Sequence, residues 1–204
     1  MKLYRAISKE NVPSNGTAYR HVSTLRAPSN VPYLVDNLWE ALRPDSMPSR
    51  RHAVYASPTA ALALSNASSV VGGANNAYRV FEVRIEGCAK VAHLDVTDAR
   101  YHDDIRQLPR AIVNTLGKEF SCLPLAERAQ VAPLFMPYMT KEDLQRLASQ
   151  SALVQKCLEE AMRQSTFWPS ASPTPKPNSP GELFFELDQS AMYYLDAMNP
   201  LDNA

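Results

Sequence analysis

The sequence predicts an α+β protein. Strand-like patterns lie near the N-terminus, another lies near the C-terminus, and the long segment between them has helical periodicity. Runs of strands followed by runs of helices are typical of the α+β class. We therefore expect one sheet core completed from both ends of the chain, with the helical segment inserted into it.

The first third of the chain is expected to contain two strands and two helices. Residues 2–8 (KLYRAIS) alternate in character and predict a strand. A long irregular stretch rich in turn residues follows, and then 33–42 (YLVDNLWEAL) has apolar residues at helical spacing. Residues 49–57 predict a second strand, after which Ser57 and Pro58 fit the N-cap and first position of a helix.

Two further strands are expected before the helical segment. Residues 77–87 (AYRVFEVRIEG) give the clearest strand pattern, and 90–96 (KVAHLDV) give the next. The segment 103–167 is predicted to be helical. Within it, Thr140 is followed three residues later by Asp143, which is typical of a capping box.

The C-terminal part is expected to be a stiff loop followed by a strand. Residues 168–181 (WPSASPTPKPNSPG) contain five prolines. This composition predicts an exposed loop that forms neither a helix nor a central strand. Residues 182–188 (ELFFELD) then predict the closing strand, with Glu182 at its start.

Length and composition fit a single domain, 1–204, with the helical insertion at 103–167. The chain has 204 residues, with 21 basic and 21 acidic side chains and a formal net charge of zero. This balance argues against a surface that attracts nucleic acid or anionic membranes everywhere, but it leaves room for a local basic patch. Three widely spaced cysteines, no secretory signal and no apolar run of about 20 residues predict a soluble, cytoplasmic protein of the producing or target cell.

Several common functional motifs are missing from the sequence. It has neither of the glycine-rich phosphate loops GxGxxG and GxxxxGK[ST], and it has no GxSxG elbow. The one cluster of metal-capable side chains comprises His93, Asp95, His102, Asp103 and Asp104. Its spacing matches no defined metal site, so a strand end running into a helix cap is the favoured interpretation and no metal is expected.

Three separated segments resemble the ADP-ribosyltransferase superfamily, bacterial toxins in particular. They are LYRAIS near the N-terminus, AVYASPTAALALSNA in the second strand and the helix after it, and GELFFELDQSAMYYL near the end. The resemblance covers about a third of the chain. It implies a split mixed β-sheet core, NAD as co-substrate, transfer to a macromolecular acceptor (protein or nucleic acid), and a toxin or effector held in check by an antitoxin or immunity protein.

The resemblance also implies roles for particular residues. Glu182 would be the catalytic acid, Tyr55 would stack on nicotinamide, and Arg5 would hold ribose or phosphate oxygens. Ser57 would orient the glutamate, and Arg50 and Arg51 would contact the diphosphate. These residue types suit the chemistry, because the nicotinamide–ribose bond breaks through an oxocarbenium-like state that a carboxylate stabilises.

The residues by themselves leave alternatives open. Glu186 lies four residues after Glu182 on the same strand face, Tyr55 is also a plausible packing residue, and Ser57 a plausible helix cap. Members that modify arginine carry Glu or Gln two residues before the catalytic Glu, where this chain has Pro180. An NAD glycohydrolase and a non-catalytic interaction module are the competing functions.

Overall fold

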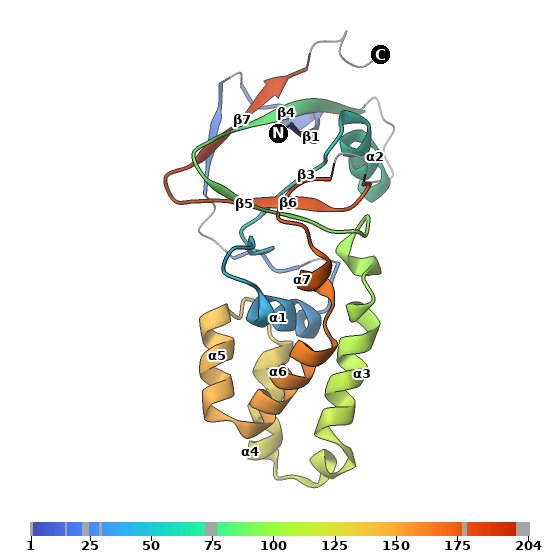
Figure 1. Cartoon of the computed structure of the whole chain (residues 1–204), viewed down its shortest axis with the longest axis vertical. Helices are drawn as coiled ribbons and strands as arrows, with labels where there is room; N and C mark the ends of the chain where they lie inside the picture. The colour runs from blue at the N-terminus through green and yellow to red at the C-terminus, as the bar shows by residue number, and fades with distance from the viewer. Residues whose placement is uncertain are drawn as a thin grey trace. The chain divides into compact units, whose positions relative to one another are not determined.

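The computed structural model describes residues 2–14, 16–21, 25–28, 30–71, 77–176 and 179–198. It has α+β secondary structure, as predicted, and its chain forms two compact units (Figure 1). The first comprises 1–24, 46–97 and 172–204, and the second comprises 25–45 and 98–171. The helical unit thus also takes in a segment from before the second predicted strand.

The first unit contains two antiparallel sheets. The four-stranded sheet has the order β1-β4-β7-β2, and the three-stranded sheet has the order β3-β6-β5. Every pairing between these strands is antiparallel, whereas the resemblance implied a mixed sheet. The strands are β1 (Leu3–Ser8), β2 (Ala18–Arg20), β3 (Val54–Ala56), β4 (Tyr78–Glu86), β5 (Ala89–His93), β6 (Leu183–Leu187) and β7 (Met192–Ala197).

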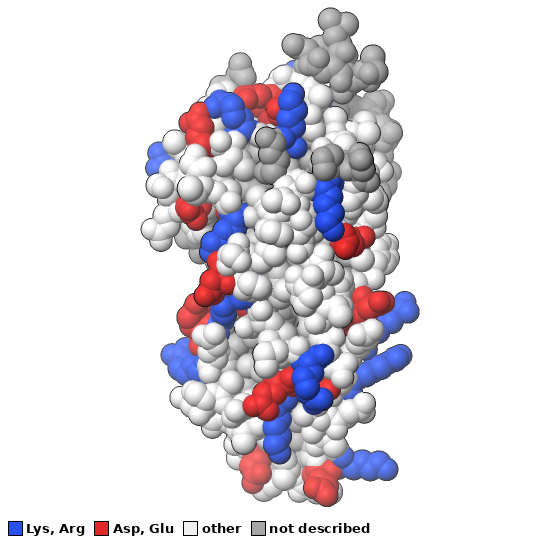
Figure 2. Space-filling view, in the orientation of Figure 1, with Lys and Arg blue, Asp and Glu red and all other residues white. Residues whose placement is uncertain are grey.

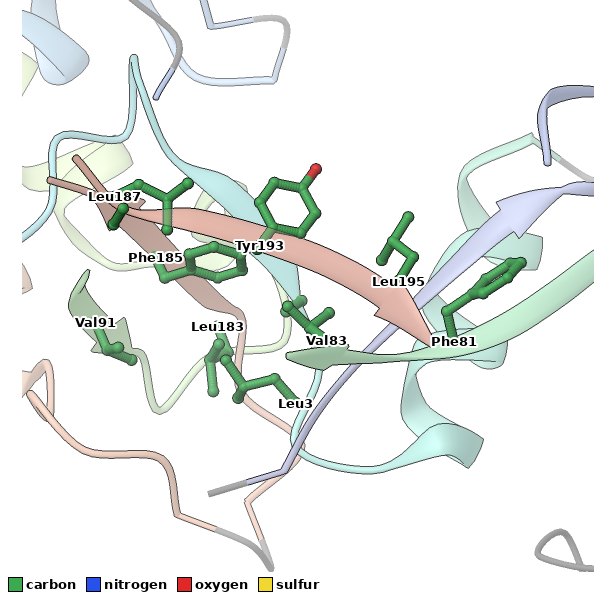
Figure 3. Packing of buried hydrophobic residues seen from close by; sticks show 11 residues of the cluster. Leu3, Phe81, Val83, Val91, Leu183, Phe185, Leu187, Tyr193 and Leu195 are labelled. Atoms are coloured by element: carbon green, nitrogen blue, oxygen red, sulfur yellow. The ribbon is translucent and has the colours of Figure 1, made fainter. Parts of the chain in front are cut away.

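The core of this unit lies between the two sheets. Leu183, Phe185 and Leu187 of β6 point into it, and they meet side chains of β1, β4 and β7 (Figure 3). Phe185 contacts Tyr193 edge to face, with ring centroids 5.5 Å apart. Burial of these apolar side chains, each worth about 1.5–3 kcal/mol when complete, is what holds the sheets together.

Two strands and one helix cap differ from the sequence-based expectation. β2 and β7 lie in segments for which no strand was predicted. Helix α2 (Ala60–Val71) begins later than predicted, because Thr59 Oγ1 accepts the Leu62 N–H at 3.2 Å and so takes the capping role assigned to Ser57. The Ser57 N–H instead donates to the Tyr4 carbonyl at 2.7 Å, so Ser57 is held in a bridge to β1.

The second unit is helical. Its helices are α1 (Tyr33–Leu42), α3 (Asp104–Leu116), α4 (Leu125–Arg128), α5 (Lys141–Gln150), α6 (Ala152–Gln164) and α7 (Phe167–Ser170). The capping box of Thr140 and Asp143 forms as predicted. The prediction for 168–181 was wrong at its start, because Trp168 belongs to α7 and is buried, donating its indole N–H to the Trp39 carbonyl at 2.7 Å.

A buried carboxylate organises the centre of the helical unit. Asp104 accepts hydrogen bonds from Trp39 Nε1 at 2.8 Å and Ser165 Oγ at 2.6 Å, and from the backbone N–H of Thr166 at 3.1 Å. Burial alone would raise the pKa of Asp104, but its interactions with His102, Ser165, Trp39 and Thr166 outweigh burial and hold the pKa well below its usual range. The group is therefore a charged, fully bonded structural element.

Candidate functional site

The three-stranded sheet has two chemically different faces. Side chains alternate along a strand, so Leu183 and Phe185 face the core while Glu182, Phe184 and Glu186 face the opposite side. In β3, Val54 and Ala56 likewise pack on the core. Tyr55 lies directly opposite Phe184 and so shares the outer face with Glu182. We call this side of the sheet the glutamate face.

The backbone fixes Glu182 on both sides. Its N–H donates to the Val96 carbonyl at 2.7 Å, and its carbonyl accepts from Leu94 N–H at 2.9 Å. The residue before it, Gly181, lies very close to the backbone of Leu94. A Cβ on Gly181 would lie 1.6 Å from the Leu94 carbonyl oxygen. Glycine is therefore required next to Glu182 because no side chain fits between the two backbones.

An arginine lies against the Glu182 carboxylate. Arg50 Nη2 is 3.7 Å from Glu182 Oε1, and the two side chains are only 6% and 11% exposed. Opposite charges in such a poorly solvated place interact more strongly than on an open surface. The structure thus brings two of the six predicted site residues into an ion pair.

A second acid holds the arginine-bearing turn. Glu186 Oε2 accepts the backbone N–H of Ser49 at 2.7 Å, and Ser49 Oγ accepts the Arg51 N–H at 3.3 Å. Arg50 and Arg51 are both buried. The sequence pointed to Glu186 only as an alternative catalytic acid. Its contact with a backbone N–H more than a hundred residues away carries no sequence signal.

The aromatic member of the site, Tyr55, packs against Phe184. The ring of Tyr55 is tilted 46° to that of Phe184, with centroids 5.8 Å apart. The buried Ser57 is two residues further along the same face, where Asn66 Nδ2 donates to its hydroxyl at 3.3 Å. Tyr4 pairs with Ser57 across the bridge to β1 and so belongs to this face as well, which the sequence analysis did not foresee.

Arg5 lies on the other side of its strand. It alternates with Tyr4 and shares the core-facing side of β1 with the buried Leu3. Its Nη1 donates to the Tyr193 hydroxyl at 2.9 Å, and the Tyr193 ring stacks on Tyr19 with centroids 4.7 Å apart. The structure therefore brings Glu182, Arg50 and Tyr55 to the glutamate face. Arg5 instead lies on the core-facing side of β1, in the other sheet.

The metal-capable cluster of the sequence is divided between different structural roles. His93 is buried with both ring nitrogens in hydrogen bonds, Asp95 pairs with Lys176 at 2.7 Å, and Asp104 is saturated by the donors described above. Across the described ranges, no three His, Cys, Asp or Glu side chains converge in a way that could hold a metal ion.

Charges on the surface in view are mixed in sign. Figure 2 shows blue and red side chains interspersed over this face of the described residues. No helix in the described part of the chain is long and apolar enough to cross a membrane.

Neither a protein-family model, nor a curated protein, nor a solved structure matches this chain.

Proposed function

We propose that this chain is an NAD-dependent ADP-ribosyltransferase of the toxin-like kind, built on a split two-sheet core. The observation that carries the proposal is the glutamate face, where Glu182, immediately before β6, meets Arg50 and shares the face with Tyr55. These groups suit cleavage of the nicotinamide–ribose bond: a carboxylate can stabilise growing positive charge, a guanidinium can bind phosphate oxygens, and an aromatic ring can stack on nicotinamide.

The proposed chemistry assigns one task to each group. Tyr55 stacks on the nicotinamide, a contact worth about 0.5–1.5 kcal/mol beyond area burial. The Glu182 carboxylate accepts a hydrogen bond from a ribose hydroxyl and stabilises the positive charge that grows on the ribose as nicotinamide leaves with the bonding electrons. The acceptor then adds to the ribose carbon and loses its proton to solvent or to Glu182.

Arg50 and Arg51 are the proposed diphosphate ligands. A guanidinium can bind phosphate oxygens through two parallel hydrogen bonds. We assign this contact to the 50–51 turn rather than to Arg5, because Arg5 donates to Tyr193 on the core side of its sheet. In this proposal a phosphate oxygen would replace the contact of Arg50 Nη2 with Glu182 Oε1.

The acceptor is a macromolecule in this proposal, and the loop before Glu182 is its recognition element. Residues 172–176 and 179–181 form the described part of this proline-rich loop. A stiffened loop loses little entropy when it binds. A transferase that is toxic in the cytoplasm also calls for an inhibitory partner, an antitoxin or immunity protein. If water replaces the acceptor, the same site gives an NAD glycohydrolase.

The test is incubation with NAD labelled in its adenylate half, together with cell lysate separated into protein and RNA. Wild type is compared with Glu182→Gln and with Glu86→Gln, the same chemical change on an exposed strand position. We expect labelled macromolecule with wild type and Glu86→Gln, and at least about a 100-fold loss with Glu182→Gln.

The other outcomes separate the alternatives. Free ADP-ribose without labelled macromolecule would identify the glycohydrolase. Intact NAD with wild type, or equal activity of the Glu182 variant, would overturn the proposal and favour a non-catalytic module.

A further inference from the structure

His93 contacts the segment before Glu182 through its ring and its backbone. It lies in β5 opposite Leu183 and is fully buried. Its ring reaches both flanks of the proline-rich loop: Nδ1 is 2.8 Å from the Lys176 backbone nitrogen, and Nε2 is 3.1 Å from the Gly181 carbonyl oxygen. None of the chemistry proposed above uses this histidine.

These two partners fix the protonation of the ring. A backbone N–H can only donate, so Nδ1 must be the unprotonated acceptor for Lys176. A carbonyl can only accept, so Nε2 must carry the hydrogen that is donated to Gly181. The imidazole is therefore neutral and held in one tautomer, and a second proton on Nδ1 would break the contact with Lys176.

The backbone of His93 holds the start of the same loop. Its N–H donates to the Ser172 carbonyl and its carbonyl accepts the Ser172 N–H, both at 2.9 Å. One residue thus binds the loop at its first residue, at Lys176, and at Gly181 immediately before Glu182. The described part of the loop is therefore held to β5 at Lys176 as well as at Ser172 and Gly181.

We propose that His93 is the positioning residue for Glu182: its neutral ring clamps the proline-rich loop at Lys176 and Gly181 and so sets where the carboxylate points. The inference rests on the proposed function. Gly181 is one peptide bond from Glu182, and a misplacement of about 1 Å at a reacting group can lower a rate about 100-fold.

The charged groups around the ring are consistent with a neutral histidine. Burial lowers the pKa of His93, and the Lys176 ammonium lowers it further, while the Gly181 carbonyl and the Asp95 carboxylate act in the opposite direction. Lys176 Nζ is itself paired with Asp95 Oδ1 at 2.7 Å, so these two charges largely offset each other at the ring.

The test removes the Lys176 N–H without touching His93. In Lys176→Pro the backbone donor is lost, because proline has no N–H. In the matched control Lys176→Ala the donor stays and only the exposed ion pair with Asp95 is lost. For each protein we would measure kcat and the KM for NAD in cleavage of NAD, and the ¹⁵N chemical shifts of the His93 ring.

We expect Lys176→Pro to lower kcat about tenfold with KM within about twofold, and Lys176→Ala to keep both within about twofold of wild type. The Nδ1 shift should be that of an unprotonated nitrogen and should change in the proline variant alone. Equal kcat in the two variants would overturn the positioning role. A protonated Nδ1 in wild type would overturn the clamp itself.

The two measurements fail independently, because the ¹⁵N measurement needs no catalytic activity. If the wild-type protein leaves NAD intact, the proposed function is refuted, and with it any catalytic use of the clamp. The ring shifts would still decide whether His93 holds the loop in the way described.

Discussion

Replacement of Gly181 by alanine gives the sharpest test of how Glu182 is held. A Cβ at this position would lie 1.6 Å from the Leu94 oxygen and 2.8 Å from the Leu94 carbonyl carbon. Ordinary van der Waals contact begins at 3.4 Å, so the two backbones must separate by about 1.8 Å, the difference between 3.4 and 1.6 Å. The obstacle is backbone, which cannot rotate away as a flexible side chain could.

The size of the effect follows from the hydrogen bonds on either side. The Glu182 N–H bond to Val96 at 2.7 Å and the Leu94 N–H bond to Glu182 at 2.9 Å would both lengthen beyond hydrogen-bonding distance. Each bond that is lost and leaves a buried group unsatisfied costs about 1–3 kcal/mol. We therefore expect Gly181→Ala to lower the free energy of unfolding by about 4 kcal/mol.

Urea unfolding followed by circular dichroism measures this loss. The matched control is Gly117→Ala, because nothing lies within 4 Å of a Cβ there and only its φ of 68° opposes the change. With its ψ of 176°, Gly117 lies in a backbone region that is almost exclusive to glycine, and strain there costs about 1–3 kcal/mol. A Gly181→Ala protein no less stable than Gly117→Ala would show that the close approach of Gly181 and Leu94 does not hold in solution.

Three further predictions concern the buried side chains of Asp104, Cys157 and His93. Asp104→Asn should lower the free energy of unfolding by about 3 kcal/mol in urea titration, since the amide cannot accept every bond that the carboxylate accepts; a loss below about 1 kcal/mol would contradict the described network. Burial raises the pKa of Cys157 to about 11, so at pH 8 a disulfide reagent should label Cys88 and Cys122 in the native protein and Cys157 only after unfolding; labelling of all three native thiols would contradict its burial. Burial lowers the pKa of His93 below 6.5, so the unfolded chain binds a proton at this residue more readily than the folded protein does. The free energy of unfolding should therefore fall as the pH drops from 6.5 towards the lower pKa of the folded protein, and His93→Gln should lose this part of the pH dependence. An equal pH dependence in the variant would assign the effect to other groups.

Much of the secondary structure followed from local patterns. The alternation of 2–8 and 77–87, the apolar spacing of 33–42, and the capping box at Thr140 all predicted elements that the structure contains. These signals are local, because side-chain periodicity and capping involve residues a few positions apart. The strands β2 and β7 were not predicted, because pairing with distant strands stabilises them and their own sequences carry no clear strand pattern.

The candidate site was only partly accessible to sequence reasoning. Resemblance and order along the chain point to six residues. Neither of them tells on which side of its strand each residue lies. Pairing of Tyr4 with Ser57 decides that Tyr4, and not Arg5, shares the face of Tyr55. A shift of one residue in that pairing would reverse the two, because side chains alternate with a period of two.

By itself the sequence determined the α+β class, the position of most strands, the helix at 33–42, the helical character of 103–167, and the presence of an acid at the start of the closing strand. The tertiary structure alone decided that Arg50 meets Glu182, that Glu186 holds the arginine turn, and that His93 holds the loop before Glu182. The physical reason is that each of these contacts joins residues more than eighty positions apart in the sequence. Strand register and backbone hydrogen bonding bring such segments together, and neither leaves a local pattern in the sequence.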